Sequence, residues 1–467
     1  MRSLDHHERY LLLLLLGCYS FFFYLGGCWN VESRICLTES VAWFGTVRID
    51  WRHQKIGDKA FYQGHYYCDK AIGASLLALP VYWVLSAVLP HPPRPVGAFP
   101  FIFKYLGNLF ATVLPSVLLG IGFYRFLRHF TDSERARLWT VLSYGLGTIA
   151  FPYSTMLFGH QTAAALIFLA FILLHSLRRQ RPTPGKLLLA GLLVGYAFLT
   201  EYPTLLIAVA LFVYLLSFLE DRRQIVWFIL GGLPPLLLLL GYNWLCFGNP
   251  FTLAYRYEAD PEFRENMARG IMGITGLKWE ALWGLTFGPR RGLFFISPFL
   301  LLAFPGFYCF FQRRDLRREF WVCGSVVLSF LGYNASYYLW TGGGSFGPRF
   351  LIPMLPFLAL PTVFCFHHEN GRLISRVLAG VSFLFVGVAT ATASTGATPE
   401  SLGIRDSANP LLEVSFRLLF QGDLKTPNLG QLLPLPGLLS LLPLGLYLGL
   451  CSAWWAWRER RNSRPES

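Results

Sequence analysis

Apolar stretches of about 20 residues recur along the whole 467-residue chain, and they limit its fold more than any other feature. A helix needs about 20 apolar residues to cross the hydrocarbon core of a bilayer. Hydrophobic residues make up 54% of the sequence, which exceeds their usual share in soluble domains and excludes a secreted or cytosolic protein. The sequence predicts an all-α polytopic membrane protein with twelve spans, at residues 10–27, 102–126, 138–156, 162–177, 187–200, 203–219, 225–245, 294–311, 320–334, 351–366, 377–393 and 433–457.

The apolar stretch at residues 71–90 decides the predicted orientation. If it does not cross the membrane, both chain ends and nearly every dense arginine cluster lie in the cytoplasm, as the positive-inside rule requires. If it crosses, those clusters lie outside. Pro80, in the middle of the stretch, favours a bent or re-entrant helix. The clusters occupy the predicted inner loops 124–137, 177–186, 220–224, 312–319 and 367–376.

The net charge of +14 follows from this distribution. Lys and Arg in short loops indicate membrane topology and contact with anionic lipid. The sequence lacks a soluble face on which basic and aromatic residues alternate, so nucleic acid is not an expected partner.

We expect one transmembrane domain, residues 1–467, with its polar loops on the outer side. The first outer loop, 28–101, is long enough to carry re-entrant or membrane-lying helices, and the last covers 394–431. The apolar N-terminal stretch is long for a signal peptide and lacks a clear cleavage site, so it predicts a retained first helix. Cys28, Cys36 and Cys68 share the first loop, where a disulfide and unpaired thiols are equally compatible with the sequence.

The first outer loop contains the candidate catalytic carboxylates Glu32, Asp50 and Asp69. Glu32 follows the first span by about one helical turn. A partly desolvated carboxylate at that depth has a raised pKa and suits a general base. The alternative is a solvated interfacial Glu32 that pairs with nearby Arg34, and spacing alone slightly favours this alternative.

The stretch GHYYCDKAIG, residues 64–73, places His65, Asp69 and Lys70 at the bilayer boundary. A lone interfacial lysine usually extends toward lipid headgroups. Here a carboxylate, a histidine and two tyrosines accompany it, which favours Lys70 as a ligand for the phosphate of a lipid-linked substrate.

Four further ionisable residues lie at outer span ends. His160 and Glu201 are candidate substrate contacts because ionisable groups at a membrane boundary are costly unless paired or functional. The alternative for both is structural hydrogen bonding. Arg349 follows a glycine-rich segment and suits a phosphate clamp, although this position alone favours an interfacial anchor. Arg290 has the same setting, with an interfacial anchor as the stronger interpretation.

The sequence does not determine a cofactor. It has no Walker A sequence, no GxGxxG after a strand and no HExxH. Asp69 and His160 are candidate ligands for a divalent metal, but they show no diagnostic spacing, so metal dependence stays open.

Together these features resemble the GT-C superfamily of polytopic glycosyltransferases, in particular glycosyltransferase 39, protein mannosyltransferase-like and lipid A aminoarabinose transferase-like enzymes. NVESR resembles the family's acidic segment after the first span, and DKAIG its acid–Lys pair. SFGPRFLIPMLP is similar to its Pro-Arg-Tyr-x-x-Pro segment. The resemblance implies Glu32 as the catalytic acid residue and a phosphate role for Lys70 and Arg349. His160 stands where the family usually has Asp, and Glu32 also replaces an Asp.

The resemblance implies an inverting transfer of a sugar from a polyprenyl-phosphate donor to an acceptor hydroxyl on a glycan, lipid or protein. The expected location is the bacterial inner membrane, with the site on the outer face and both chain ends in the cytoplasm. Two alternatives are a lipid or sugar transporter and a non-catalytic subunit of a glycan assembly system. Neither the sugar nor the acceptor can be read from the sequence.

Overall fold

Every predicted span is helical in the computed structural model of the protein, which describes residues 4–89, 99–393 and 407–462. Several spans are one helix each. They are α1 (His6–Phe21), α8 (Gly159–Arg179), α9 (Pro184–Thr200), α10 (Leu205–Phe218), α11 (Ile225–Phe247), α16 (Arg317–Ser336), α19 (Glu369–Ala393) and α21 (Leu442–Asn462).

The remaining spans are interrupted. α4 (Phe99–Asn108) continues through a π-helical turn into α5 (Leu114–Phe126). The predicted span at 138–156 is two helices, α6 (Glu134–Gly147) and α7 (Ala150–Ser154), and its single-helix form was wrong. Prolines, which lack a backbone N–H, accompany the other interruptions. These are α14 (Leu293–Ile296) with α15 (Ala303–Gln312), and a 3₁₀ turn (Arg349–Met354) with α17 (Leu355–Ala359) and α18 (Val363–His367).

Six helical segments in the described chain are long and apolar enough to cross a membrane, and four further apolar helices are shorter. The two most buried of the six are Arg349–His367 and Gly159–Arg179, with 89% and 72% of their apolar windows buried. They pack on each other, with the rings of Phe168 and Phe357 4.9 Å apart. The centre of the molecule therefore carries His160 and Arg349 at the starts of its two innermost segments. The count of twelve spans stays a prediction.

The first loop folds into its own small layer. It contains α2 (Trp29–Phe44), a hairpin of β1 (Ala60–Tyr62) and β2 (His65–Tyr67), and α3 (Gly73–Val88). The strands are antiparallel, with Ala60 opposite Tyr67. α3 has 16 residues, about 24 Å of helix, which is shorter than the roughly 30 Å hydrocarbon core. This length agrees with a helix that does not cross, although orientation stays a prediction. Residues 90–98 of this loop lie outside the described ranges.

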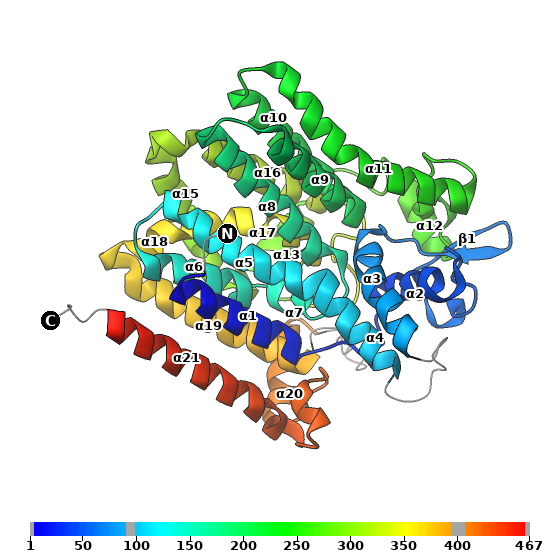
Figure 1. Ribbon diagram of the computed structural model, residues 1–467. Helices are drawn as coiled ribbons and strands as arrows, with labels where there is room; N and C mark the ends of the chain where they lie inside the picture. Colours follow the sequence, from blue (N-terminus) through cyan, green and yellow to red (C-terminus); the bar gives the residue numbers. More distant parts are fainter. Residues whose placement is uncertain (1–3, 90–98, 394–406, 463–467) are drawn as a thin grey trace.

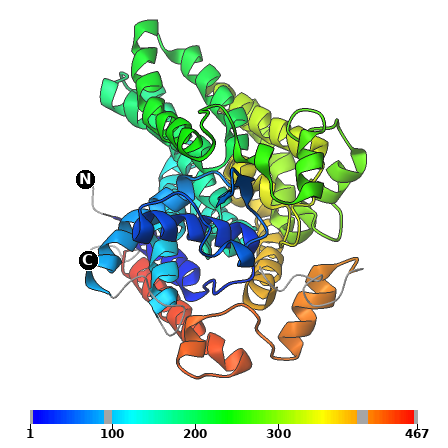
Figure 2. The ribbon, with the colours of Figure 1, turned by 90° about the vertical axis from the view of Figure 1, so that its right-hand side faces the viewer.

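Polar contacts join four of the predicted inner loops and both chain ends at one end of the helices, which we call the arginine-rich end, and the fifth loop, 220–224, shares a cavity with one of them. The first-loop elements α2, α3 and β1 lie at the opposite end (Figure 1). Figure 2 shows α20 (Arg417–Phe420) and α21 on the side away from α9 to α11. The joining contacts include His6–Glu459 (2.9 Å), Glu8–Arg125 (2.7 Å), Thr131–His367 (2.9 Å), Arg178 to the Asp315 carbonyl (3.3 Å), and the cavity shared by Glu220 and Arg317.

One local expectation was wrong, and one open alternative is decided. The first helix ends at Phe21 rather than at residue 27, because the next residues become extended and Phe22 pairs with Asn428. All nine cysteines are free thiols, so the first loop holds no disulfide. Residues 394–406 of the last outer loop lie outside the described ranges, and residues 411–420 are helical.

Candidate active site

The first turn of α2 directs three consecutive side chains into different contacts. Glu32 pairs with Arg52 and Lys104, the Ser33 hydroxyl donates to Asp69 Oδ1 at 3.3 Å, and Arg34 binds Glu201. Consecutive residues on a helix project about 100° apart, which allows one turn to reach three partners. The expected pairing of Glu32 with Arg34 was therefore wrong.

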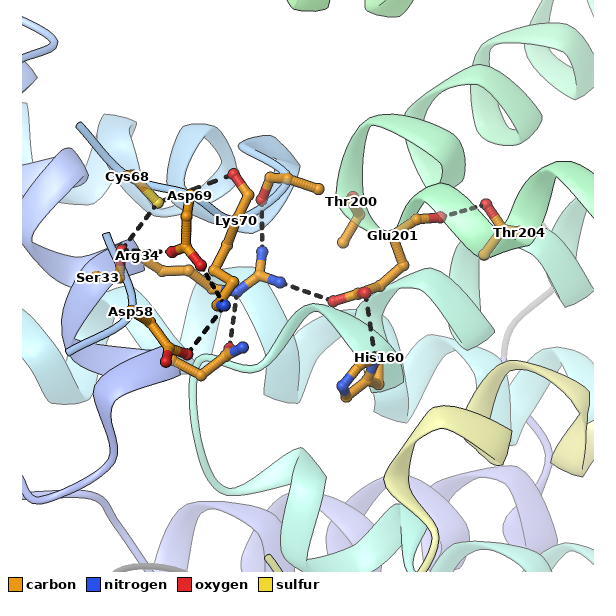
Figure 3. A network of polar contacts seen from close by, with 12 residues as sticks. Ser33, Arg34, Asp58, Cys68, Asp69, Lys70, His160, Thr200, Glu201 and Thr204 are labelled. Carbon is orange, nitrogen blue, oxygen red and sulfur yellow. Dashed lines mark hydrogen bonds and ion pairs between the residues drawn. The ribbon is translucent and has the colours of Figure 1, made fainter. Parts of the chain in front are cut away.

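Arg34 is buried, and each of its three guanidinium nitrogens donates a hydrogen bond. Its Nη2 donates to Glu201 Oε1 at 2.7 Å, its Nη1 to the Ala71 carbonyl at 2.5 Å, and its Nε to Asn30 at 3.2 Å. Thus one guanidinium ties α2 to the start of α3 and to the turn between α9 and α10 (Figure 3). Burial opposes ionisation of Glu201, but His160 and Arg34 outweigh it and lower the pKa of Glu201 to about 2.

His160 joins this group through Glu201. Its Nδ1 lies 3.4 Å from Glu201 Oε2, and its Nε2 is buried with no hydrogen-bond partner in the described chain. The preceding residue must be small, because a Cβ on Gly159 would lie 2.2 Å from Glu201 Oε1 and 2.7 Å from the Thr200 carbonyl oxygen. The close approach of α8 to the α9–α10 turn therefore requires glycine here.

Lys70 lies between two carboxylates. Its ammonium is 3.0 Å from Asp58 Oδ2 and bonds Asp69 directly (Figure 3). Burial acts to lower the pKa of Lys70, but Asp58 and Asp69 raise it well above the usual value, so the ammonium stays charged. The Asp69 side chain is fully buried, whereas 27% of the Asp58 side chain is exposed. Asp58 is thus the carboxylate of this pair that a ligand can reach. The sequence does not predict that Asp58 pairs with Lys70.

Glu258 is a site residue that sequence reasoning missed. It follows a 3₁₀ turn (Ala254–Tyr257) in the loop after α11, and Ala60 of β1 forms a bridge with it. The side chain is 2% exposed, and its Oε1 has no hydrogen-bond partner among the described residues. Burial first, and then the charge of Asp69, raise the pKa of Glu258 to about 11. Its carboxyl is therefore neutral at pH 7, and it holds a proton beside Asp69.

Arg349 differs from the other site cations because no described acidic group pairs with it. Its guanidinium carbon lies 5.0 Å from the Phe158 ring centroid and 5.1 Å from that of Phe350. Its Nε is buried and has no hydrogen-bond partner within the described ranges. The Phe350 ring beside Arg349 lies 5.5 Å from the His160 ring, and His160 pairs with Glu201. Arg34 binds both Glu201 and the carbonyl of Ala71, the residue after Lys70. Arg349 and Lys70 therefore belong to one site.

Glu32 belongs to a neighbouring polar cluster. Its Oε1 lies 3.0 Å from Lys104 Nζ, and its Oε2 pairs with Arg52. Arg52 also binds Glu39 at 2.7 Å. Burial raises the pKa of Glu39 to about 8, although Lys104 acts against that rise. Two cations thus flank the Glu32 carboxylate, one at each oxygen.

The other candidates lie farther from this group. Asp50 accepts hydrogen bonds from His65 Nδ1 at 2.8 Å and from the Tyr66 amide at 2.6 Å. The side chains of Asp50 and His65 are each more than one-third exposed. Arg290 is exposed, whereas its neighbour Arg291 is buried and bonds the Thr341 carbonyl. The structure therefore brings together Lys70, Asp69, His160, Glu201 and Arg349, but not Asp50, His65 or Arg290.

Potential metal ligands converge elsewhere. Within the described ranges, a group of three that could hold an ion consists of His6, His7 and Glu459, at the arginine-rich end. Asp69 and His160 bond different partners, Lys70 and Glu201 respectively. Metal binding by these two residues stays a prediction.

Comparison with known proteins places this geometry in context. A family model described as dolichyl-phosphate-mannose-protein mannosyltransferase matches residues 101–240. The crystal structure of ArnT from Cupriavidus metallidurans bound to undecaprenyl phosphate matches with a TM-score of 0.53 and 14% identity, over 96% of this chain and 75% of that one. Apo ArnT gives a TM-score of 0.49 at 16% identity, over 95% and 74%. Among curated proteins, none matches the sequence.

A third solved structure has a similar arrangement of helices. The apo oligosaccharyltransferase of Archaeoglobus fulgidus matches with a TM-score of 0.48 and 11% identity, over 91% of this chain and 57% of that one. ArnT is a member of the GT-C superfamily. The predicted fold class and the resemblance are confirmed: the chain is a multi-pass helical membrane protein with the GT-C-type fold, and a segment of it matches a glycosyltransferase family.

Proposed function

We propose that the protein transfers a sugar from a polyprenyl-phosphate donor to an acceptor hydroxyl, at the end of the helices where the first loop lies. The observation that carries this proposal is that two cations border the buried group around Glu201: Arg349, whose Nε has no hydrogen-bond partner in the described chain, and Lys70, whose ammonium two carboxylates hold. Two cations in a largely buried site suit a phosphate that leaves with a negative charge. The bound undecaprenyl phosphate in the structure of ArnT supports this ligand class.

In the proposed reaction, the acceptor oxygen attacks the anomeric carbon as the bond from that carbon to the phosphate oxygen breaks. The bonding electrons leave with the polyprenyl phosphate, which Arg349 and Lys70 stabilise. The acceptor proton passes to Glu32, and the anomeric configuration inverts because one displacement occurs. For the phosphate to reach Lys70, it takes the place of the partly exposed Asp58 carboxylate, whereas buried Asp69 stays bonded.

The test is transfer of a radiolabelled sugar from polyprenyl phosphate to membrane glycan, with purified protein in proteoliposomes. We expect Arg349→Gln and Glu32→Gln each to lower the transfer rate by about 10²-fold or more, as loss of an oxyanion partner or general base does. Asp50→Asn, on the exposed hairpin, is the control and should stay within about twofold of wild type.

Two outcomes contradict parts of the proposal. If Glu32→Gln keeps full transfer activity and Asp58→Asn loses it, the general base is Asp58 rather than Glu32. Movement of the intact donor across the bilayer, with no transfer by the wild type, identifies a transporter and removes the proposed reaction.

A further inference from the structure

A second candidate site lies at the arginine-rich end of the molecule. A cavity of about 840 Å³ opens between the end of α8, the α10–α11 turn and the start of α16. α8 runs 21 residues from Gly159 to Arg179, about 30 Å, which matches the bilayer core. The cavity is therefore separated from the candidate active site by about one membrane thickness. Five arginines line it, Arg178, Arg222, Arg314, Arg317 and Arg318.

One of these arginines, Arg178, is fixed by contacts to residues of α16 and the turn before it. Arg178 Nε lies 2.9 Å from Glu319 Oε1, and its Nη2 donates to the Asp315 carbonyl at 3.3 Å. Glu319 is fully buried. Its Oε1 also accepts hydrogen bonds from His175 Nδ1, at 2.9 Å, and from the Tyr214 hydroxyl. The ion pair with Glu319 already restricts the Arg178 side chain. Less conformational entropy is therefore lost when a ligand binds to it.

The cavity has an excess of positive charge. Its two acidic residues are Glu220 and Asp315. Both Asp315 oxygens lie 3.0 Å from Arg313, which does not line the cavity, so this carboxylate is already neutralised. The side chains of Arg314 and Arg318 have no ion pair or hydrogen bond to any residue in the described part of the chain. Their guanidinium groups are exposed and available to an anion.

The cavity also has an apolar wall at the depth of lipid headgroups. Phe218, Leu216 and Trp321 line it together with the arginines. Trp321 follows Arg317 by one turn of α16, and 63% of its surface is exposed. Tryptophan is enriched at the membrane–water interface. A ligand in this cavity thus meets cations on one side and a membrane-facing aromatic surface on the other.

We propose that this cavity binds a phosphoryl anion carried by the headgroup of an anionic phospholipid in the leaflet opposite to the candidate active site. Arginine forks bind phosphate through paired N–H groups. The acyl chains would lie against Trp321 and Phe218 in the bilayer. A soluble phosphate monoester offers the same headgroup chemistry without the chains, and the experiment separates the two sources.

The test compares two triple variants of the full chain in nanodiscs or detergent. Arg314→Gln/Arg317→Gln/Arg318→Gln removes three cavity charges. Arg128→Gln/Arg135→Gln/Arg181→Gln removes three exposed charges elsewhere in the predicted inner loops. Native mass spectrometry measures retention of phosphatidylglycerol against phosphatidylcholine. We expect at least a tenfold loss of phosphatidylglycerol affinity in the cavity variant and less than a threefold change in the control.

Other outcomes are equally decisive. Equal phosphatidylglycerol affinity of the two triple variants overturns the proposal. Glycerol phosphate that binds as tightly as the lipid, and only when the cavity arginines are present, overturns the lipid source and leaves a soluble phosphate ligand. The single variant Arg318→Gln removes an exposed side chain without described partners, so it should fold normally and show part of the loss.

Discussion

Arg34 and Arg349 carry the same charge, but their surroundings give them different roles. Each guanidinium nitrogen of Arg34 donates a hydrogen bond, to Glu201, Ala71 and Asn30, and the side chain is 2% exposed, so a substrate has little access to it. Arg349 lies against two aromatic rings with its Nε unbonded among the described residues. At the scale of single residues, the first is a structural tie and the second is available to a ligand.

Arg34→Gln should strongly destabilise the protein. The change leaves the Glu201 carboxylate buried beside a neutral group, which typically costs about 3–5 kcal/mol. We expect a clear decrease in Tm in detergent, measured by intrinsic fluorescence. Adding Glu201→Gln to the same chain should recover part of the loss, because it removes the unpaired charge. A double variant less stable than Arg34→Gln alone contradicts this account.

Glu258 should make stability depend on pH. Its folded pKa of about 11 exceeds its unfolded value near 4.5, so the folded protein holds the proton more tightly. Its contribution is complete below about pH 4.5 and is lost as the pH rises toward 11, by at most about 1.4 kcal/mol per pH unit. Between pH 6 and pH 9, wild type should therefore lose more stability than Glu258→Gln, as measured by thermal unfolding. Parallel pH profiles of the two proteins refute this assignment.

At the scale of elements, the site depends on how closely the start of α8 approaches the turn after α9. Glycine at position 159 permits this contact, because any Cβ there would overlap the Glu201 side chain. The same approach places His160 against that carboxylate. Close packing of two element ends therefore determines whether the charged groups meet.

Gly159→Ala should separate these elements. The added methyl group would overlap Glu201 and Thr200, and overpacking of this kind costs about 1–3 kcal/mol. We expect a lower Tm and reduced sugar transfer. Gly185→Ala in α9 is the matched control, because no atom lies within 4 Å of the added carbon. The control should be neutral or slightly stabilising, and an equal loss in both variants would falsify the steric explanation.

At the scale of the whole molecule, both chain ends and the arginine-rich loops lie at one end, and the first loop lies at the other (Figure 1). This division follows from helices that start and end at opposite sides of one apolar layer. It is also the arrangement that the positive-inside rule predicts. We therefore expect the arginine-rich end to face the cytoplasm.

Cysteine labelling can establish that orientation. Lys55 in the first loop and Asp221 between α10 and α11 are both exposed. We expect a membrane-impermeant maleimide to label Lys55→Cys in intact spheroplasts, and Asp221→Cys only after permeabilisation. Wild type reports the background from the native thiols. The reverse labelling pattern shows that the site faces the cytoplasm.

The sequence by itself determined the helical membrane class, the approximate spans and the acid–Lys pair Asp69–Lys70, because hydropathy and local order are properties of contiguous residues. It also identified His160, Glu201 and Arg349 as isolated ionisable groups. Only the tertiary structure decided their partners. Arg34 pairs with Glu201, 167 positions away, and Glu258 approaches Asp69 from a distant loop. Such pairings depend on helix packing and loop closure, which no local pattern encodes.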